Sequence, residues 1–266
     1  MCRLIAMHAD RVLPAAGPLA DDPHALVVQS YRDLRGERHV DGWGIGHYTH
    51  GRPQIVRGLT PAFEDPQFLA AARAVRSRTV LGHIRQASVG SLSLENTHPF
   101  ALGAWMFAHN GTVTGFSALE QQLATETAPD LLAKRRGSTD SELVFYWLLT
   151  RLLPAGAYAQ RLATGLDATV IELGRALVLL DERSRRAAPQ DTPRFNFLLT
   201  DGQVLLASRW NHSLEWRSTD RGNLGRSLLL ASEPTSDSSE QDSWQELPDH
   251  SILAVNSDIL TQVHSI

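Results

Sequence analysis

Short apolar runs bounded by turn residues occur in two blocks of the chain, and each run predicts a β-strand. The first block contains the runs 3–8, 44–48, 54–57, 79–86 and 104–109. The second block contains the runs 195–200, 204–209, 213–217, 227–231 and 252–255. The sequence Thr200-Asp201-Gly202-Gln203 is typical of a hairpin turn, so we expect the first two strands of the second block to pair.

Two long helical patterns lie between these blocks. The range 139–153 predicts a helix, which Ser138 or Thr139 can cap, and Glu142 follows Thr139 at the spacing of a capping box. From about Ala157 to Leu180, leucine and valine recur at the helical period of about 3.6 residues, which predicts a second helix. Shorter helices are expected over 22–31 and 64–75, each opening at an Asp-Pro pair.

The order of strands, helices and strands favours an α+β layered sandwich over a doubly wound βαβ fold. Residues 1–266 contain no internal repeat and no evident linker, so one domain is expected. The polar segments 185–193 and 233–245 predict surface loops, and the second, rich in Ser and Asp, predicts a mobile one.

Composition and charge exclude several classes of protein. Hydrophobic residues make up 42% of the chain, charged residues 20%, and the net charge is -4, so a globular protein is expected and a nucleic-acid binder is not. The basic runs 134–136 and 183–186 are therefore interpreted as solvated helix ends or loops. No apolar run approaches the ~20 residues of a membrane span, and the N-terminal residues lack a signal-peptide pattern, so a cytoplasmic protein is predicted.

The single cysteine, Cys2, excludes an internal disulfide and a cysteine zinc site. His83, His98 and His109 lack the spacing of a helix-borne ligand pair, so neither a metal nor another cofactor is predicted. Removal of Met1 would leave Cys2 with a thiol and a free α-amine, whose pKa of about 7.7–8.0 suits a general base. The alternative interpretation is a half-buried cysteine in the first strand.

Three further segments could serve a nucleophile. Asn110-Gly111 follows a predicted strand and could donate to an oxyanion, although Asn-Gly is also a common hairpin turn. Arg85 could hold a carboxylate, or form a structural ion pair. Asp140 could bind an ammonium group, or cap a helix. Together Arg85 and Asp140 would complement the head group of a free amino acid.

These residues, in this order, resemble the class II glutamine amidotransferases, the N-terminal-cysteine branch of the Ntn hydrolases, and in particular their small stand-alone bacterial members. The matching segments fall within roughly the first 150 residues. They are Met1-Cys2, Asp41-Gly42-Trp43-Gly44, Gly82-His83-Ile84-Arg85-Gln86-Ala87, Asn96-Thr97-His98-Pro99-Phe100, His109-Asn110-Gly111 and Thr139-Asp140-Ser141-Glu142.

The resemblance implies a four-layer αββα sandwich of two antiparallel sheets. It implies Cys2 as the nucleophile, Asn110 and Gly111 at the oxyanion, Arg85 on the glutamine α-carboxylate and Asp140 on the α-amine. By the same resemblance Trp43 and Gly44 would shape the pocket wall, with His98 nearby. Many members have Trp or Tyr after the arginine, whereas this chain has Gln86, so specificity at that wall is open.

The expected activity is attack on a γ-glutamyl amide with release of ammonia or an amine. Three alternatives remain open at this point. Free glutamine could be the substrate, with water or a separate ammonia-accepting synthase as the acceptor. A larger γ-glutamyl compound could be the substrate, as in the sister group that acts in ergothioneine synthesis. A retained Met1 would block the α-amine and leave a ligand-binding or interaction module without activity.

Overall fold

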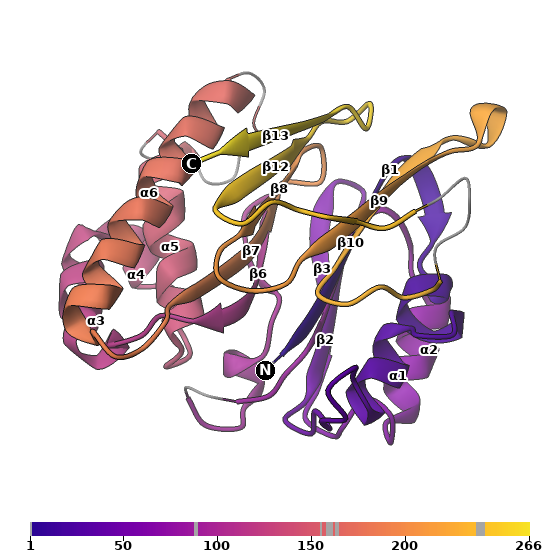
Figure 1. The fold of residues 1–266 in the computed structure, drawn as a ribbon, viewed down its shortest axis with the longest axis horizontal. Helices are drawn as coiled ribbons and strands as arrows, with labels where there is room; N and C mark the ends of the chain where they lie inside the picture. The colour runs from indigo at the N-terminus through magenta and orange to yellow at the C-terminus, as the bar shows by residue number, and fades with distance from the viewer. Residues whose placement is uncertain (1, 88–89, 155, 158–161, 163–164, 238–242) are drawn as a thin grey trace.

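Two antiparallel sheets lie face to face in the computed structural model, which describes residues 2–87, 90–154, 156–157, 162, 165–237 and 243–266. Helices cover the outer face of each sheet (Figure 1). The predicted α+β sandwich of two antiparallel sheets is therefore confirmed.

The first sheet, sheet A, has seven strands in the order β11-β9-β10-β1-β4-β2-β3. Its central strands β1 and β4 pair antiparallel, with Leu4 opposite His83. The bounds in sheet A are β1 Arg3–Pro14, β2 Trp43–Thr49, β3 Arg52–Gly58, β4 Arg76–Ile84, β9 Glu215–Asp220, β10 Arg226–Ala231 and β11 Gln245–Glu246.

The second sheet, sheet B, has six strands in the order β13-β12-β8-β7-β6-β5. The hairpin predicted at 200–203 joins β7 to β8, which pair antiparallel. The bounds in sheet B are β5 Phe100–Leu102, β6 Trp105–Thr112, β7 Arg194–Thr200, β8 Leu205–Arg209, β12 Ser251–Val255 and β13 Thr261–Ser265.

Helices α1 (Leu26–Tyr31) and α2 (Pro66–Ala74) lie on the side of sheet A in Figure 1. The other four helices lie on the side of sheet B: α3 Phe116–Glu126, α4 Pro129–Leu132, α5 Asp140–Leu152 and α6 Leu166–Ala187. Three short helical segments complete the described elements: η1 Gly17–Asp21, η2 Leu94–Asn96 and η4 Gly222–Leu224.

Side-chain alternation along the strands sorts the core into three apolar layers. On β1, Leu4 and Ala6 face the space between the sheets, where they meet Met106 and Ala108 of β6. The residues between them face outward, as Ile5 does toward helices α1 and α2. A third layer fills the space between sheet B and helices α3, α5 and α6. This alternation decides which polar side chains share a cavity.

The helix predicted over 139–153 is confirmed as α5, and the Thr139 hydroxyl caps it by accepting from the Glu142 amide. The capping box does not close, because the Glu142 carboxylate accepts instead from the amides of Arg136 and Gly137. The helix expected over 64–75 is confirmed as α2, whose first turn is capped by Asp65.

Three sequence predictions need correction. The helix expected from Ala157 to Leu180 begins at Leu166, after a left-handed Gly165, and continues to Ala187; residues 158–161 and 163–164 lie outside the described part. Its last turn carries basic residues, which the helix dipole favours at a C-terminus. The helix expected over 22–31 begins only at Leu26. In the expected loop 233–245, Glu233 is buried against Arg3, and residues 238–242 are not described.

Candidate functional site

Cys2 immediately precedes β1 and is half-buried. By the alternation along β1, its side chain lies on the same side as Leu4 and faces sheet B. Its Sγ lies 3.3 Å from both the amide nitrogen and the carbonyl oxygen of Gln86. Burial raises the pKa of the thiol, while the Gln86 main chain and the charge of Arg85 act in the opposite direction. The sulfur therefore needs a base before it can attack.

A buried ion cluster, formed by Arg3, Asp33, His39 and Glu233, holds the main chain of Cys2. The Arg3 guanidinium donates to the Cys2 carbonyl at 2.9 Å and forms ion pairs with Asp33 and Glu233. His39 Nε2 lies 3.1 Å from the Asp33 carboxylate. We name this group the Arg3 cluster; it lies on the outer face of sheet A and fixes the residue that carries the thiol.

Arg85 follows the last residue of β4, and its position is fixed by its own main chain. The Arg85 amide donates to the Gly42 carbonyl at 2.9 Å, and the Asp41 amide donates to the Arg85 carbonyl at 3.2 Å. Asp41 also accepts from the amide of Ala87 at 2.7 Å. The motif 41–44 thus holds the segment that borders the Cys2 sulfur.

The guanidinium of Arg85 is buried and donates to the carbonyl oxygens of Ser91 at 3.0 Å and Gly90 at 3.2 Å. Asn96 supports the same loop, since its amide nitrogen donates to the Ser91 carbonyl at 3.1 Å. Its amide oxygen accepts from the Ser138 main chain at 2.8 Å. Asn96 therefore joins the Arg85 loop to the segment before α5.

Asn110 and Gly111 lie inside β6, paired with Asn196 and Phe195 of β7, so the hairpin-turn alternative is excluded. Asn110 is fully buried, and neither its amide nitrogen nor its amide oxygen has a hydrogen-bond partner among the described residues. Because Met106 and Ala108 of β6 face sheet A, alternation turns Asn110 the same way, toward the side of Cys2. A Cβ on Gly111 would overlap the Arg194 carbonyl, so only glycine fits there.

Asp140 is the first residue of α5 and is buried. Its Oδ2 accepts from the Val113 amide at 2.9 Å, and its Oδ1 accepts from the Ser141 amide at 2.7 Å and hydroxyl at 3.1 Å. A carboxylate has about four lone-pair positions, so one side remains for a ligand donor. The Asp140 charge also raises the pKa of the Cys2 thiol, less than burial does.

Two histidines, His83 and His98, lie between the sheets, and His83 contacts the main chain of β6 at His109, the residue before Asn110. The ring of His98 lies 4.3 Å from that of His83, measured between centroids. His83 Nε2 contacts the His109 carbonyl at 3.1 Å, while both ring nitrogens of His98 lack partners among the described residues. Burial lowers the pKa of His83 to about 3 and that of His98 well below its usual range. We name His83, His98 and Asn110 the inter-sheet cluster.

His109 takes a different place from the other two histidines. Its ring packs edge-on against Phe197, on the helix side of sheet B. Nδ1 lies 2.9 Å from the Ser141 hydroxyl and Nε2 lies 2.9 Å from the Arg194 carbonyl. His109 thus braces β6 against α5.

The described residues include no group of three His, Cys, Asp or Glu side chains arranged to hold a metal ion.

Positions 43 and 44 face opposite sides of β2. The Trp43 indole packs at 5.1 Å against Phe68 of α2 and donates to Asp65 at 2.9 Å, in the outer layer. The expectation that its side chain shapes the pocket wall is therefore corrected, because alternation turns it away from Cys2. Gly44 faces the inter-sheet side, where a Cβ would overlap the His98 carbonyl.

The roles of Arg3 and Asn96 were not predicted from the sequence. Arg3 carried a signal, since a charged residue inside an otherwise apolar strand implies a buried partner. Asn96 begins the segment 96–100 that resembles the family, but its partners Ser91 and Ser138 come together only in the fold. No described helix is both long and apolar enough to cross a membrane.

Comparisons with known proteins identify the family and the fold of the chain. The family model described as glutamine amidotransferases class-II matches residues 1–218. The γ-glutamyl-hercynylcysteine sulfoxide hydrolase of Mycolicibacterium smegmatis is 30% identical over 261 residues, covering 96% of both chains. A glutamine aminotransferase class-II domain protein from Silicibacter pomeroyi superposes with a TM-score of 0.68 at 25% identity, covering 100% of this chain and 99% of its own. The glutamine phosphoribosylpyrophosphate amidotransferase of B. subtilis shares the fold, with a TM-score of 0.65 at 16% identity over 99% of this chain and 49% of its own.

Proposed function

The chain belongs to the class II glutamine amidotransferases, and we propose that it is an amidohydrolase whose Cys2 thiol attacks the γ-carbonyl of glutamine or of another γ-glutamyl amide. The observation that carries the proposal is the fully buried Asn110 amide, which has no partner among the described residues and faces the side of the sheet on which Cys2 lies. A buried amide of this kind costs about 1–3 kcal/mol, so a ligand is its natural partner.

The proposed reaction begins with the α-amine that removal of Met1 would expose; Met1 itself lies outside the described residues. The amine accepts the thiol proton, and the thiolate sulfur forms a bond to the γ-carbon. The resulting oxyanion receives hydrogen bonds from the Asn110 amide and the Gly111 main chain. The α-ammonium then protonates the departing nitrogen, and the C–N bond breaks to leave a γ-glutamyl thioester. Water cleaves the thioester to glutamate and restores the thiol.

Recognition of the head group is assigned to two buried charges. The Arg85 guanidinium is suited to the α-carboxylate, because it presents five donors and two of them already fix its plane on the carbonyls of Gly90 and Ser91. Asp140 is suited to the α-ammonium, because its negative charge and its one remaining lone-pair position complement that cation. His98, whose lowered pKa keeps it neutral, would form part of the pocket wall. Its main-chain carbonyl packs closely against Gly44, and this contact fixes its position.

A larger γ-glutamyl compound is the second candidate substrate. It is favoured by the relative from M. smegmatis, named for hydrolysis of γ-glutamyl-hercynylcysteine sulfoxide, which matches nearly the whole chain. Gln86, which replaces the aromatic residue of many members, leaves a smaller and more polar wall beside the sulfur. With free glutamine as substrate, a separate synthase could take the ammonia.

The test measures the intact mass of the native protein and its hydrolysis of glutamine and of γ-glutamyl amides, beside a Cys2→Ser variant. We expect a mass without Met1 and a drop in kcat of roughly 10⁴-fold or more in the variant, with unchanged folding by circular dichroism. A glutamine-analogue alkylator should label Cys2 alone. A protein that keeps Met1 in every molecule and hydrolyses none of these amides would instead be a binding module.

A further inference from the structure

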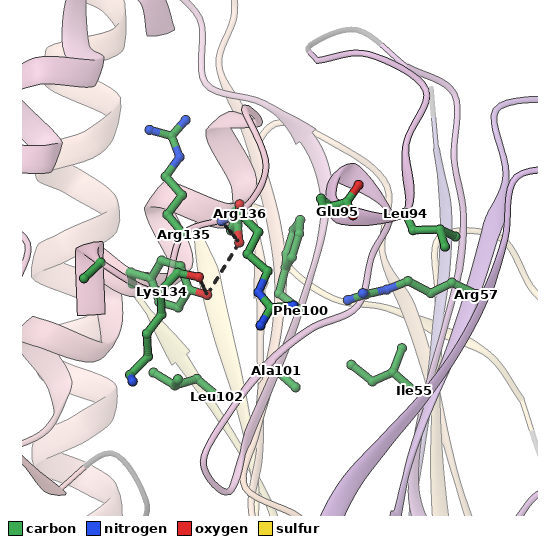
Figure 2. A pocket seen from close by; sticks show the side chains of 13 residues that line it. Ile55, Arg57, Leu94, Glu95, Phe100, Ala101, Leu102, Lys134, Arg135 and Arg136 are labelled. Atoms are coloured by element: carbon green, nitrogen blue, oxygen red, sulfur yellow. Dashed lines mark hydrogen bonds between the residues drawn. The ribbon is translucent and has the colours of Figure 1, made fainter. Parts of the chain in front are cut away.

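A cavity of about 530 Å³ opens at the edge of the sandwich, outside the set formed by Cys2, Arg85, Asn110 and Asp140. Its walls come from β3 of sheet A, from the segment η2–β5, and from the residues that join α4 to α5. Figure 2 shows this cavity and its lining side chains. The charged side chains that line it are Arg57, Glu95, Lys134, Arg135, Arg136 and Glu142.

Arg57 forms the wall on the side of sheet A. It lies two residues after Ile55 on β3, and Ile55 packs against the layer between the sheets, so alternation turns Arg57 inward as well. One terminal nitrogen donates to the Pro99 carbonyl, while the buried Nε has no partner among the described residues. A guanidinium has five donors, so Arg57 retains several for a ligand.

Arg136 lines the opposite wall, and in Figure 2 the Arg57 side chain points across the cavity toward the side of Arg136. Glu142 holds this wall in place, because its carboxylate accepts from the amides of Arg136 at 3.1 Å and Gly137 at 2.6 Å. Arg135 points away and pairs with Glu120 at 2.8 Å.

The charges of the cavity do not balance. Arg57, Lys134 and Arg136 bring three cations against the two carboxylates of Glu95 and Glu142, so these side chains leave a net positive charge. Glu95 lies at the exposed rim. Two guanidinium groups that line one cavity repel each other, and an oxyanion bound between them would receive paired hydrogen bonds from both.

We propose that this cavity binds the carboxylate or phosphate group of a small molecule between the guanidinium groups of Arg57 and Arg136. The anion belongs either to the amine portion of a γ-glutamyl substrate or to a separate small molecule. Both sources would act next to the candidate active site. On one wall, Arg57 donates to the carbonyl of Pro99, which follows His98. On the other wall, Ser138 lies two residues after Arg136, and its amide donates to Asn96, which supports the Arg85 loop.

The first experiment titrates the full chain with inorganic phosphate and, separately, with malonate at low ionic strength in a calorimeter. We expect saturable binding that weakens about tenfold in Arg136→Gln, which loses one of the two charge-assisted partners. Arg135→Gln is the matched control and should bind like the wild type, since its side chain points out of the cavity. An Arg57→Gln,Arg136→Gln variant should show no saturable binding.

Arg136 is exposed, so its variant tests the proposal even if substitution of the half-buried Arg57 impairs folding. Absence of saturable binding of both anions to the wild type would overturn the proposal. Equal affinity in the wild type and Arg136→Gln would overturn it as well.

The second experiment separates the two sources of the anion with γ-glutamylglycine and its neutral counterpart, γ-glutamylmethylamide. If the anion belongs to the substrate, Arg136→Gln should raise KM about tenfold for γ-glutamylglycine only. If it belongs to a separate molecule, KM should stay constant for both amides while phosphate affinity falls. A protein that binds phosphate through Arg136 but hydrolyses neither amide nor glutamine would refute the proposed function and leave the anion site standing.

Discussion

Two buried polar groups lie on opposite faces of sheet A near Cys2, and they differ in how their polar atoms are used. In the Arg3 cluster, on the outer face, the Arg3 guanidinium is paired with two carboxylates and with the Cys2 carbonyl. In the inter-sheet cluster, the Asn110 amide and the His98 ring nitrogens have no partners among the described residues. The Arg3 cluster pairs its opposite charges within the protein, whereas the inter-sheet cluster offers donors and acceptors to a ligand.

The difference separates two reasons for placing polar groups inside a protein. Breaking a buried ion pair leaves a charge uncompensated and costs about 3–5 kcal/mol, so the Arg3 cluster ties stability to the position of the nucleophile. A buried amide without a partner lowers stability by about 1–3 kcal/mol, so Asn110 persists for a reason other than folding. Substitutions in the two clusters should therefore have opposite signatures.

The largest effect on stability is expected from Arg3→Met. The substitution leaves the buried carboxylates of Asp33 and Glu233 without their cation, so the free energy of unfolding should fall by about 3–5 kcal/mol in urea denaturation. Loss of the hydrogen bond to the Cys2 carbonyl should also lower kcat in the folded fraction, because the nucleophile is less firmly positioned.

Arg73→Met is the matched control for Arg3→Met. Arg73 pairs with Asp21 at 3.1 Å, but its side chain is 61% exposed, so the change should be below about 1 kcal/mol. If both variants unfolded at the same urea concentration, the Arg3 cluster would not be the stabilising element described here.

The opposite signature is expected from Asn110→Leu. Removal of one oxyanion donor should lower kcat by roughly 10²–10³-fold, with little change in KM. The melting temperature should stay constant or rise, because an amide without partners is replaced by an apolar group of similar size. Steady-state kinetics and differential scanning calorimetry measure the two effects separately.

Asn196→Leu is the control, because Asn196 lies directly opposite Asn110 on β7 and its amide is fully engaged. It donates to the carbonyls of His212 at 3.2 Å and Ser213 at 2.8 Å and accepts from the Trp210 amide at 2.9 Å. This variant should lose about 1–3 kcal/mol of stability. Equal losses of stability at positions 110 and 196 would argue against a ligand role for Asn110.

Most of the fold followed from patterns within single elements. The strand at 104–109 was visible as an apolar run, and the helix at 139–153 as a capped periodic segment. The start of α6 was not visible in the sequence, because the periodic apolar pattern extends to residues before Gly165. The helix begins only after the left-handed backbone of this glycine. The helix α3 was missed because its apolar stripe, with Leu119 and Leu123 as its buried residues, is narrow.

The candidate site likewise contains residues that the sequence could identify and contacts that it could not. Cys2, Arg85, Asn110 and Asp140 could be selected because each belongs to a short motif of the class II family, whose resemblance the comparisons confirm. Alternation within Trp43-Gly44 already contained the correction for Trp43, since neighbouring residues of a strand face opposite sides. The partners of Arg3 were beyond sequence reasoning, because Glu233 reaches it only through the pairing of β1 with β10.

The effect that is smallest near neutral pH is the response of the inter-sheet cluster to acid. Burial lowers the pKa of His83 to about 3, from an ordinary value of about 6.5 in the unfolded chain. Between these values the unfolded state binds a proton that the folded state does not, so stability is lost as the pH falls through this window. His83→Gln keeps a donor for the His109 carbonyl but does not titrate. For each protein, the loss of unfolding free energy on acidification is measured from its own value at about pH 8. Below about pH 6.5 this loss should be smaller in the variant than in the wild type, by up to about 1.4 kcal/mol per pH unit. Urea denaturation of both proteins across that range measures the difference, and identical slopes would mean that the space between the sheets admits a proton without penalty.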